Sequence, residues 1–593
     1  MRGDQSGKCS EVSQDHAPHH GILAGCGYPY HAGSGRAGRY MMRRFIEGNL
    51  DQHYDVVVVG GGITGAAVAY EAASRGLKTA LVEKNDFSSA TSSATSKLIH
   101  GGLRYLANME FSLVRESLKE RKVLEDIAPN FVYPFPMLMT HYKSSLKNSK
   151  WVVKAGLTLY DILSYDRGST WDKSKKIPLH RTISTDEALS MQPSLRKEDL
   201  TGASIFYDCM SIFPERLTLA FIKSAVAFGA HVANYTRVDG FLFDDEGSVA
   251  GVRVTDLLRS TEHEVRGDVT INCGGPWADI ILGLAKSVEK TDTLRRSEGI
   301  HIITKKKIDQ GCIVGAMSRK GRHFFLIPWR FHTLIGTTDK EYIGSPDDYR
   351  VTRQSIMELI DEVNSTLGDG FVKFEDVLYT YGGLRPLVEE QTEGTYHSSR
   401  KYEIYDNAAD GLKGLITVEG GKYTTSRNLA ENVMGLVWKK TNKPVGKTIS
   451  DRRYLKGCEI RDMHAFMESL HEKYPAFADN TLDYLGRNYG AECAAVVKLA
   501  EKDRSLAETL NSDGEILAEV VYAVREEMAR RLSDIVLRRT GLATLGNPGK
   551  KVLRHIARIA ARELGWDSVT LEREIAHTQG LLKIPVDGSS IAA

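Results

Sequence analysis

A glycine-rich segment between two apolar runs constrains the fold of this 593-residue chain most strongly. The run Val56–Val59 is short and wholly apolar, as a buried parallel strand requires. The next residues read G-x-G-x-x-G, and an alanine-rich helical stretch follows. A second apolar run, Thr79–Val82, ends on the acidic Glu83. This order of strand, glycine turn, helix, strand and acid predicts a βαβ unit.

Each part of this unit suits one part of a dinucleotide. Gly60 permits a tight turn, Gly62 lets the backbone approach a pyrophosphate, and Gly65 lets the helix pack closely on the strand. The free N–H groups and the positive dipole end of the helix favour phosphate. Glu83 can accept hydrogen bonds from both ribose hydroxyls, which favours an unphosphorylated ribose. A glycine-rich turn of an ordinary α/β protein is the alternative, and the complete unit favours dinucleotide binding over it.

The segments after this unit favour FAD over NAD as the dinucleotide. Residues 91–96 are mostly small hydroxyl residues without a hydrophobic period, which suits a loop along an extended polar ligand. Two later apolar runs end in paired glycines, at Gly274–Gly275 and Gly420–Gly421. A helix that begins after the second pair would direct its positive end at a flavin and stabilise the negative charge of the reduced ring. Two ordinary strand–turn–helix connections are the alternative.

Several motifs along the chain, taken together, resemble those of FAD-dependent glycerol-3-phosphate dehydrogenases. In chain order they are SATSSATSKLIHGGLRYL from Ser89, TINCGGPW from Thr270, IPW from Ile327, GTTD from Gly336, GGLRPL from Gly382 and EGGKYTT from Glu419. The similarity extends more loosely into the C-terminal part, through YGAE from Tyr489. The combination of motifs is specific to this family, although no single one of them would be.

The resemblance implies the fold class and the domains. We expect an α/β protein of the D-amino-acid-oxidase type, with a Rossmann-type FAD-binding domain interleaved with an antiparallel-sheet substrate domain in residues 51–445. A C-terminal all-helical domain is expected in residues 446–593, which contain no D-x-[DN]-x-[DN]-G loop of a calcium-binding EF-hand. Residues 1–50 show no periodicity and hold several arginines, so we expect a targeting or disordered segment there. A sequence extension ahead of Met41 is the alternative.

The resemblance also assigns residues to substrate binding. Oxidation of sn-glycerol 3-phosphate to dihydroxyacetone phosphate requires a cationic pocket for a dianion, and the planar fork of arginine binds phosphate at two points. Arg104 and Arg385 each follow Gly-Gly-Leu, so we expect them on turns. Arg400 and Tyr105 complete the expected substrate contacts, although Arg400 has a weaker local motif and a surface position is its alternative.

A base must take the proton of the hydroxyl group that is oxidised. His301, on an apolar β-like segment, is the first choice because histidine titrates near neutrality, and a structural role is its alternative. His100 is expected at the flavin, and Lys422 is expected to stabilise the reduced flavin or the developing alkoxide. We therefore expect catalytic roles for His301, Arg385 and Lys422. The residues expected to contact FAD are Gly60, Gly62, Ile63, Thr64, Gly65, Glu83, Lys84, Thr91, Ser92, Ser93, Ser96, Lys97, Leu98, His100, Gly101, Gly102, Val238, Gly274, Gly275, Trp277, Gly383, Leu384, Gly421, Lys422 and Thr424.

A membrane surface and a quinone are the expected partners for reoxidation of the flavin. The sequence contains no run of 18 apolar residues, so no helix is expected to span a bilayer. Ser145–Leu163 combines lysines with Trp151 and aliphatic residues, which suits a membrane interface as well as an internally packed helix. For Lys550–Arg562 the internally packed helix is the preferred interpretation. The expected location is the mitochondrial inner membrane in a eukaryote, or otherwise the cytoplasmic face of the bacterial membrane.

Composition adds limits to these expectations. The net charge of +2 gives no indication of a nucleic-acid partner, and none is expected. The seven cysteines form no C-x-x-C pair, so neither a disulfide framework nor a metal site is expected, and a reducing compartment fits best. The sequence does not fix the oligomeric state, for which a homodimer is one expectation.

Three other functions use much of the same sequence. A glycerol-3-phosphate oxidase would pass electrons to oxygen with nearly the same residues. An amine or amino-acid oxidase of the same fold needs one arginine for a carboxylate, so the pair formed by Arg104 and Arg385 argues against it. A flavoprotein without enzymatic activity is the third alternative.

Overall fold

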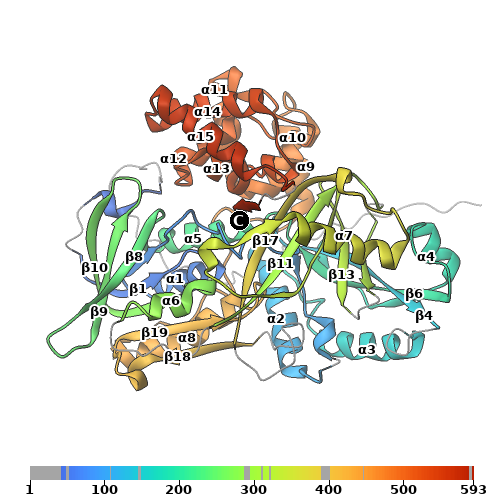
Figure 1. Ribbon diagram of the computed structural model, residues 1–593, viewed down its shortest axis with the longest axis horizontal. Coiled ribbons are helices and arrows are strands. Elements are labelled where there is room, and N and C mark those ends of the chain that lie inside the picture. Colours follow the sequence, from blue (N-terminus) through green and yellow to red (C-terminus); the bar gives the residue numbers. More distant parts are fainter. Residues whose placement is uncertain are drawn as a thin grey trace, which may run out of the picture. The chain divides into compact units, whose positions relative to one another are not determined.

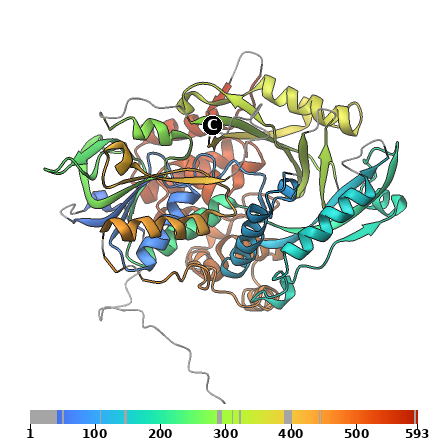
Figure 2. The ribbon, with the colours of Figure 1, turned by 90° about the horizontal axis from the view of Figure 1, so that it is seen from below.

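Two large β-sheets with flanking helices, a small two-stranded sheet and a C-terminal group of helices make up the described part of the chain (Figure 1 and Figure 2). The computed structural model describes residues 42–592 apart from 49–51, 107, 144–148, 286–293, 309–310, 319–321, 389–400, 442, 445 and 587–589. Strands of the two sheets alternate along the sequence, so the chain passes between the sheets several times. This is the interleaving that the sequence predicted.

The first sheet has a parallel centre in the order β19–β10–β1–β2–β7. Its strands are β1 (Tyr54–Val59), β2 (Thr79–Val82), β7 (His231–Ala233), β8 (Thr236–Phe243), β9 (Val249–Asp256), β10 (Thr261–Asn272), β18 (Tyr402–Asp406) and β19 (Leu415–Gly420). Helices α1 (Ile63–Ser74), α5 (Pro214–Ala227) and α8 (Ser426–Thr441) pack together against the central strands. The predicted βαβ unit is therefore present, with its second strand ending directly before Glu83.

Two of the predicted glycine roles follow from steric contacts. Gly60 has φ +109°, and a Cβ atom there would lie 2.5 Å from the carbonyl oxygen of Cys273. A Cβ atom on Gly65 would lie 1.9 Å from the carbonyl oxygen of Gly60. Side chains at these positions would push helix α1 away from strands β1 and β10, so glycine is what lets the helix begin at the sheet edge.

The second sheet is mainly antiparallel and runs in the order β15–β11–β14–β13–β12–β4–β6–β3, with β17 against β11 and β5 against β6. Only the neighbours β4 and β12 run parallel among its described strand pairs. The strands are β3 (Leu98–Ile99), β4 (Tyr133–Tyr142), β5 (Arg181–Ile183), β6 (Leu200–Met210), β11 (Arg295–Thr304), β12 (Ile313–Met317), β13 (His323–Trp329), β14 (His332–Gly336), β15 (Lys340–Tyr342) and β17 (Val377–Leu387).

Further helices flank these sheets. They are α2 (Phe111–Ile127), α3 (Lys150–Leu163), α4 (Thr185–Met191), α6 (Ala278–Leu282) and α7 (Arg353–Leu367). Helix α3 lies along the second sheet and buries Val153, Leu157 and Tyr160, while its opposite face carries exposed apolar side chains. No described helix is long and apolar enough to cross a membrane.

The C-terminal helices gather in one group, drawn in orange and red in Figure 1. They are α9 (Met463–Lys473), α10 (Asp479–Tyr489), α11 (Cys493–Lys502), α12 (Ala518–Glu526), α13 (Leu532–Asp534), α14 (Lys550–Leu564) and α15 (Ser568–Leu581). Helix α14 buries Leu553, Ile556 and Ile559 in this group, so it is the internally packed helix that the sequence favoured. One short strand, β20 (Ser590–Ala592), departs from the expected all-helical composition by pairing with β16 (Arg350–Thr352).

Residues near the start of the described chain correct one predicted boundary. Met42 is buried, and Arg44 forms an internal ion pair with Asp256 at 2.7 Å. Residues 42–48 therefore belong to the folded unit, although the sequence placed them in a targeting or disordered segment. The remainder of that predicted segment lies outside the described residues.

Candidate active site

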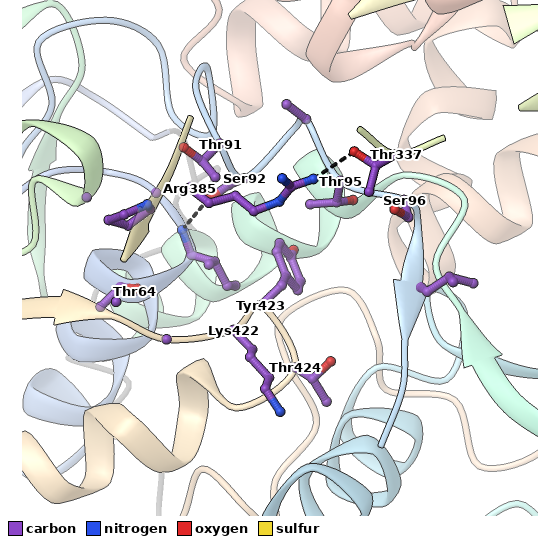
Figure 3. A pocket seen from close by; sticks show the side chains of 18 of the residues that line it. Thr64, Thr91, Ser92, Thr95, Ser96, Thr337, Arg385, Lys422, Tyr423 and Thr424 are labelled. Carbon is purple, nitrogen blue, oxygen red and sulfur yellow. Dashed lines mark hydrogen bonds between the residues drawn. The ribbon is translucent and has the colours of Figure 1, made fainter. Parts of the chain in front are cut away.

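A cavity of about 1370 Å³ is lined by residues of both sheets and of helices α1 and α3. Figure 3 shows hydroxyl side chains, Arg385 and Lys422 around this space. The volume exceeds the roughly 300–1000 Å³ of an ordinary small-molecule site. An extended ligand together with a smaller one would therefore fit.

One end of the cavity has the geometry of a dinucleotide site. Gly62 and Thr64, at the start of α1, line it, and Gly62 provides no side-chain cap for the helix. Glu83 lies at the end of β2, where its carboxylate accepts hydrogen bonds from the backbone N–H groups of Gly61 at 2.6 Å and Asn85 at 2.8 Å. Burial raises the pKa of Glu83. Each carboxylate oxygen still has a lone pair for a ribose hydroxyl.

Asp347 connects the two sheets across this end. Its Oδ1 atom accepts a hydrogen bond from Lys84 Nζ at 2.5 Å and another from Trp277 Nε1 at 3.0 Å. Lys84 also lies 4.5 Å from the centre of the Trp277 ring. All three residues line the cavity. They form a bridge beside the dinucleotide residues, and the sequence predicted FAD contacts for two of them, Lys84 and Trp277.

Arg385 lines the cavity from strand β17 rather than from the turn that the sequence predicted. Its Nη2 donates to Thr337 Oγ1 at 2.7 Å, and its Nη1 donates to the carbonyl oxygen of Thr338 at 3.2 Å. The guanidinium crosses strand β11 at Gly299, where a Cβ atom would lie 1.9 Å from Nη2. The side chain is thus held by fixed acceptors at the wall of the cavity.

His301 lines the cavity from strand β11, the neighbour of β17, and is 1% exposed. A hydrogen bond of 2.9 Å joins its Nε2 atom to Ser96 Oγ. Its Nδ1 atom is buried and has no hydrogen-bond partner among the described residues. Burial lowers the pKa of His301 well below its usual value, and the positive charges of Arg385 and Lys97 lower it further. The imidazole is therefore neutral at physiological pH and able to accept a proton.

Arg104 and Lys422 gather at Tyr105. Lys422 Nζ lies 4.0 Å from the centre of the Tyr105 ring and donates to Ser117 Oγ at 3.1 Å. The guanidinium carbon of Arg104, in the short helix Leu103–Leu106, lies 5.1 Å from the same ring. His100 is near these cations, and burial lowers its pKa to about 4. The cavity thus carries positive charge at both Arg385 and the Tyr105 side.

Comparisons with known proteins decide the family. A family described as FAD dependent oxidoreductase matches residues 55–427, and one described as the C-terminal domain of alpha-glycerophosphate oxidase matches residues 448–571. A protein of Synechocystis sp. named glycerol-3-phosphate dehydrogenase is 34% identical over 548 residues, which are 90% of this chain and 97% of that protein. The chain belongs to the FAD-dependent glycerol-3-phosphate dehydrogenase family.

Further members of the family agree in sequence and fold. An aerobic glycerol-3-phosphate dehydrogenase of Staphylococcus aureus is 32% identical and covers 84% of this chain and 89% of its own length. The solved structure of the glycerol-3-phosphate dehydrogenase from Bacillus halodurans, complexed with FAD, has a TM-score of 0.72 at 28% identity. The match covers 91% of this chain and 96% of the solved chain. The predicted fold class and the FAD cofactor of this glycerol-3-phosphate dehydrogenase family member are thereby confirmed.

The cavity gathers most of the residues that the sequence assigned to FAD and substrate. Those that line it are Gly60, Gly62, Ile63, Thr64, Glu83, Lys84, Thr91, Ser92, Ser96, Leu98, His100, Gly102, Arg104, Tyr105, Val238, Gly274, Gly275, Trp277, His301, Arg385, Gly421, Lys422 and Thr424. Those that do not line it are Gly65, Ser93, Lys97, Gly101, Gly383 and Leu384. Arg400 lies outside the described residues. The individual contacts to FAD and substrate remain predictions.

The geometry of these residues fits FAD. The start of α1 gives a phosphate group backbone N–H donors, and Ser92 Oγ accepts from the N–H of Ile63 at 2.9 Å, which fixes the polar loop against that helix. Gly275 has φ +55° and a Cβ position that meets no atom within 4 Å, so its backbone borders open space. A dinucleotide can therefore lie against backbone along the cavity, as the family requires.

Several lining residues were missed by sequence reasoning. Asp208, Thr337, His323 and Asp347 face the cavity from strands or turns of the second sheet or its connections. Asp208 accepts hydrogen bonds from the hydroxyl group of Tyr160 at 2.8 and 3.0 Å. No short motif surrounds Asp208, His323 or Asp347. For Thr337, the GTTD motif gave a local signal.

Proposed function

We propose that the protein oxidises sn-glycerol 3-phosphate to dihydroxyacetone phosphate and passes the electrons to a quinone. One observation carries the proposal: a fixed arginine and a buried histidine lie together on the wall of an FAD-sized cavity. Arg385 on β17 and His301 on β11 both line the cavity, and these two strands are neighbours in the second sheet. The names of the related proteins support the same substrate.

Arg385 binds the phosphate dianion in this proposal, together with Arg104. A guanidinium donates two parallel hydrogen bonds to phosphate, and the fixed contacts of Arg385 reduce the entropy lost on binding. Lys422 adds positive charge where the oxygen of the substrate becomes negative. An amino-acid oxidase needs one cation for a carboxylate, so this arrangement of three cations favours a phosphorylated alcohol.

His301 accepts the hydroxyl proton in this proposal. Its imidazole is neutral, buried and beside Ser96, so a substrate hydroxyl can donate to it within the cavity. Bound FAD supplies the acceptor for the hydride that leaves the alcohol carbon. The loss of one hydride and one proton converts the secondary alcohol into the ketone.

An exposed apolar face on helix α3 supports a membrane surface and a quinone acceptor. Trp151 is 74% exposed and Ile162 is 63% exposed. Val152 is half-exposed and also lines the cavity, as do Gly156 and Leu159 of the same helix. A lipid-soluble acceptor would reach the cavity from a membrane that contacts α3. The membrane is the mitochondrial inner membrane in a eukaryote and the cytoplasmic face of the bacterial membrane otherwise.

Anaerobic addition of sn-glycerol 3-phosphate tests the oxidation. The absorbance of the bound flavin is expected to bleach, and sn-glycerol 1-phosphate serves as the control substrate. A flavin that stays oxidised would exclude the proposed activity. The reduced protein is then mixed with a short-chain quinone or with oxygen. Fast reoxidation by the quinone and slow reoxidation by oxygen are expected.

A glycerol-3-phosphate oxidase is the second candidate, because residues 448–571 match the family described as the C-terminal domain of alpha-glycerophosphate oxidase. Peroxide formed at the rate of substrate loss, without added quinone, would establish it in place of the dehydrogenase.

Sedimentation with anionic liposomes tests the membrane surface. Trp151→Ser is expected to weaken binding roughly 10- to 100-fold, since burying a large aromatic side chain contributes roughly 1.5–3 kcal/mol. Trp438→Ser is the matched control, because Trp438 is 56% exposed on helix α8. Equal binding of both variants would contradict the proposal that α3 contacts the membrane.

A further inference from the structure

Lys97 lies behind the substrate end of the cavity rather than on its wall. Its side chain is 3% exposed, and its Nζ atom donates to Glu215 Oε2 and to the carbonyl oxygen of Ser93, both at 3.3 Å. Glu215 is equally buried. A buried ion pair contributes little net stability because both charges lose their hydration. The place of this pair beside the site is therefore the feature to explain.

Tyr381 connects this ion pair to the site. Lys97 Nζ lies 5.2 Å from the centre of the Tyr381 ring. On strand β17, Tyr381 stacks on His301 with ring centres 4.9 Å apart and an angle of 19° between the planes. The Tyr381 hydroxyl group donates to the carbonyl oxygen of Thr95 at 2.8 Å. The ring is thus fixed at its outer edge, and its face sets the plane of the imidazole.

The charged groups nearest to His301 are positive. Arg385 comes from β17, and Lys97 comes from the loop before β3. Strand β14 presents Gly336, where a Cβ atom would lie 2.4 Å from His301 Cδ2, so no side chain fits on that side. Each of these two cations has a carboxylate beside it. Glu215 pairs with Lys97, and Asp339 Oδ2 lies 3.9 Å from Arg385 Nη1. Arg330, farther back, adds a third positive charge near Lys97.

We propose that Tyr381 and Lys97 are positioning residues for His301. The Tyr381 ring fixes the plane of the imidazole. The Lys97 ammonium, held by Glu215, disfavours a positive charge on the imidazole before the substrate binds. The proton then comes from the substrate hydroxyl, and the phosphate dianion compensates the charge that the imidazole gains. The inference rests on the proposed role of His301 as the base.

Variants of two neighbouring tyrosines test the stacking. Tyr381→Leu is expected to lower the limiting rate of anaerobic flavin reduction by sn-glycerol 3-phosphate about 10- to 100-fold, because a misplaced base loses part of its roughly 10²- to 10⁴-fold contribution. The half-saturating concentration should change less than threefold. Tyr381→Phe keeps the ring and is expected to retain most of the rate. Tyr379→Leu is the matched control on the same strand, since the Tyr379 ring lies 6.4 Å from Tyr381.

Charge variants test the role of the ammonium. Lys97→Met combined with Glu215→Gln removes both charges and is expected to move the acid limb of the pH–rate profile up by less than about one pH unit, because the loss of the carboxylate offsets part of the effect of losing the ammonium. The two ring distances place Lys97 Nζ at most about 10 Å from the imidazole centre. Coulomb's law at an effective dielectric constant of about 20 gives roughly one pKa unit for the ammonium alone, and the nearby carboxylate opposes this effect. Lys97→Arg keeps the charge and is expected to keep the acid limb of the wild type.

Several outcomes would overturn the inference. Wild-type reduction rates in Tyr381→Leu, or an equal loss in Tyr379→Leu, would show that the stacking has no specific role. An acid limb that does not move in the double variant would exclude the proposed effect of Lys97 on His301. The ratio of FAD to protein is measured for every variant, and if the double variant does not retain FAD, the tyrosine variants decide. A wild-type protein whose flavin is not reduced at all would exclude the proposed function itself.

Discussion

Replacement of Arg385 by alanine tests the phosphate site most directly. The guanidinium is held at the cavity wall by Thr337 Oγ1 at 2.7 Å and by the carbonyl oxygen of Thr338 at 3.2 Å. Alanine removes the cation and both of its fixed donors. Among the described residues that line the cavity, the only other arginines are Arg104 and Arg237. The FAD end of the cavity keeps all of its own residues, so the variant should remain yellow.

The expected loss follows from two charge-assisted hydrogen bonds. Each contributes about 1.5–3 kcal/mol, so a bidentate contact contributes roughly 3–6 kcal/mol to binding of the transition state. Since about 1.4 kcal/mol corresponds to a factor of ten, kcat/KM should fall roughly 10²- to 10⁴-fold. Arg385→Lys keeps the charge but loses the fork, and an intermediate loss is expected.

Stopped-flow reduction of the bound flavin under anaerobic conditions measures this loss across substrate concentrations. Gly299→Ala is a companion variant that keeps the arginine, because its Cβ atom would lie 1.9 Å from Nη2 and displace the guanidinium. It should reproduce a large part of the loss. A change of less than threefold in Arg385→Ala would refute the phosphate role. Loss of FAD from the variant would instead assign Arg385 to the cofactor site.

Three further predictions follow from the contacts. His301→Ala should slow flavin reduction about 10²-fold or more at unchanged FAD content, and unchanged kinetics would remove it from the mechanism. Asp347→Ala breaks the bridge to Lys84 and should weaken FAD binding roughly 3- to 10-fold in a flavin-fluorescence titration, whereas equal affinity would contradict the bridge. Burial alone would raise the pKa of Asp86, but two arginines lower it to about 2. Its stabilising effect is therefore present above about pH 4 and is lost as the pH falls towards 2. Asp86→Asn should lower the free energy of unfolding at pH 7 by about 3–5 kcal/mol in chemical denaturation, and the exposed Glu264→Gln, as control, by less than about 1 kcal/mol.

The nucleotide-binding unit and, through the combination of motifs, the family could be predicted without a structure. The strand from Tyr54, the glycine turn, helix α1 and Glu83 are contiguous, and their spacing reports local geometry directly. The same holds for the hydroxyl-rich loop and for the glycine pair before Lys422. Such features can be read from a sequence because backbone conformation and short-range packing depend on neighbouring residues.

The contacts between distant residues could not be predicted from the sequence and depend on the packing of the folded chain. Arg385 lies on a strand instead of a turn, because its Gly-Gly-Leu segment pairs with β11. Lys97 lies within the best-matching motif, yet it points away from the cavity to Glu215, which is 118 residues later in the chain. Asp347 pairs with Lys84 across an even longer stretch of sequence. These contacts depend on the register and packing of two interleaved sheets, and no local pattern of residues records which strands become neighbours.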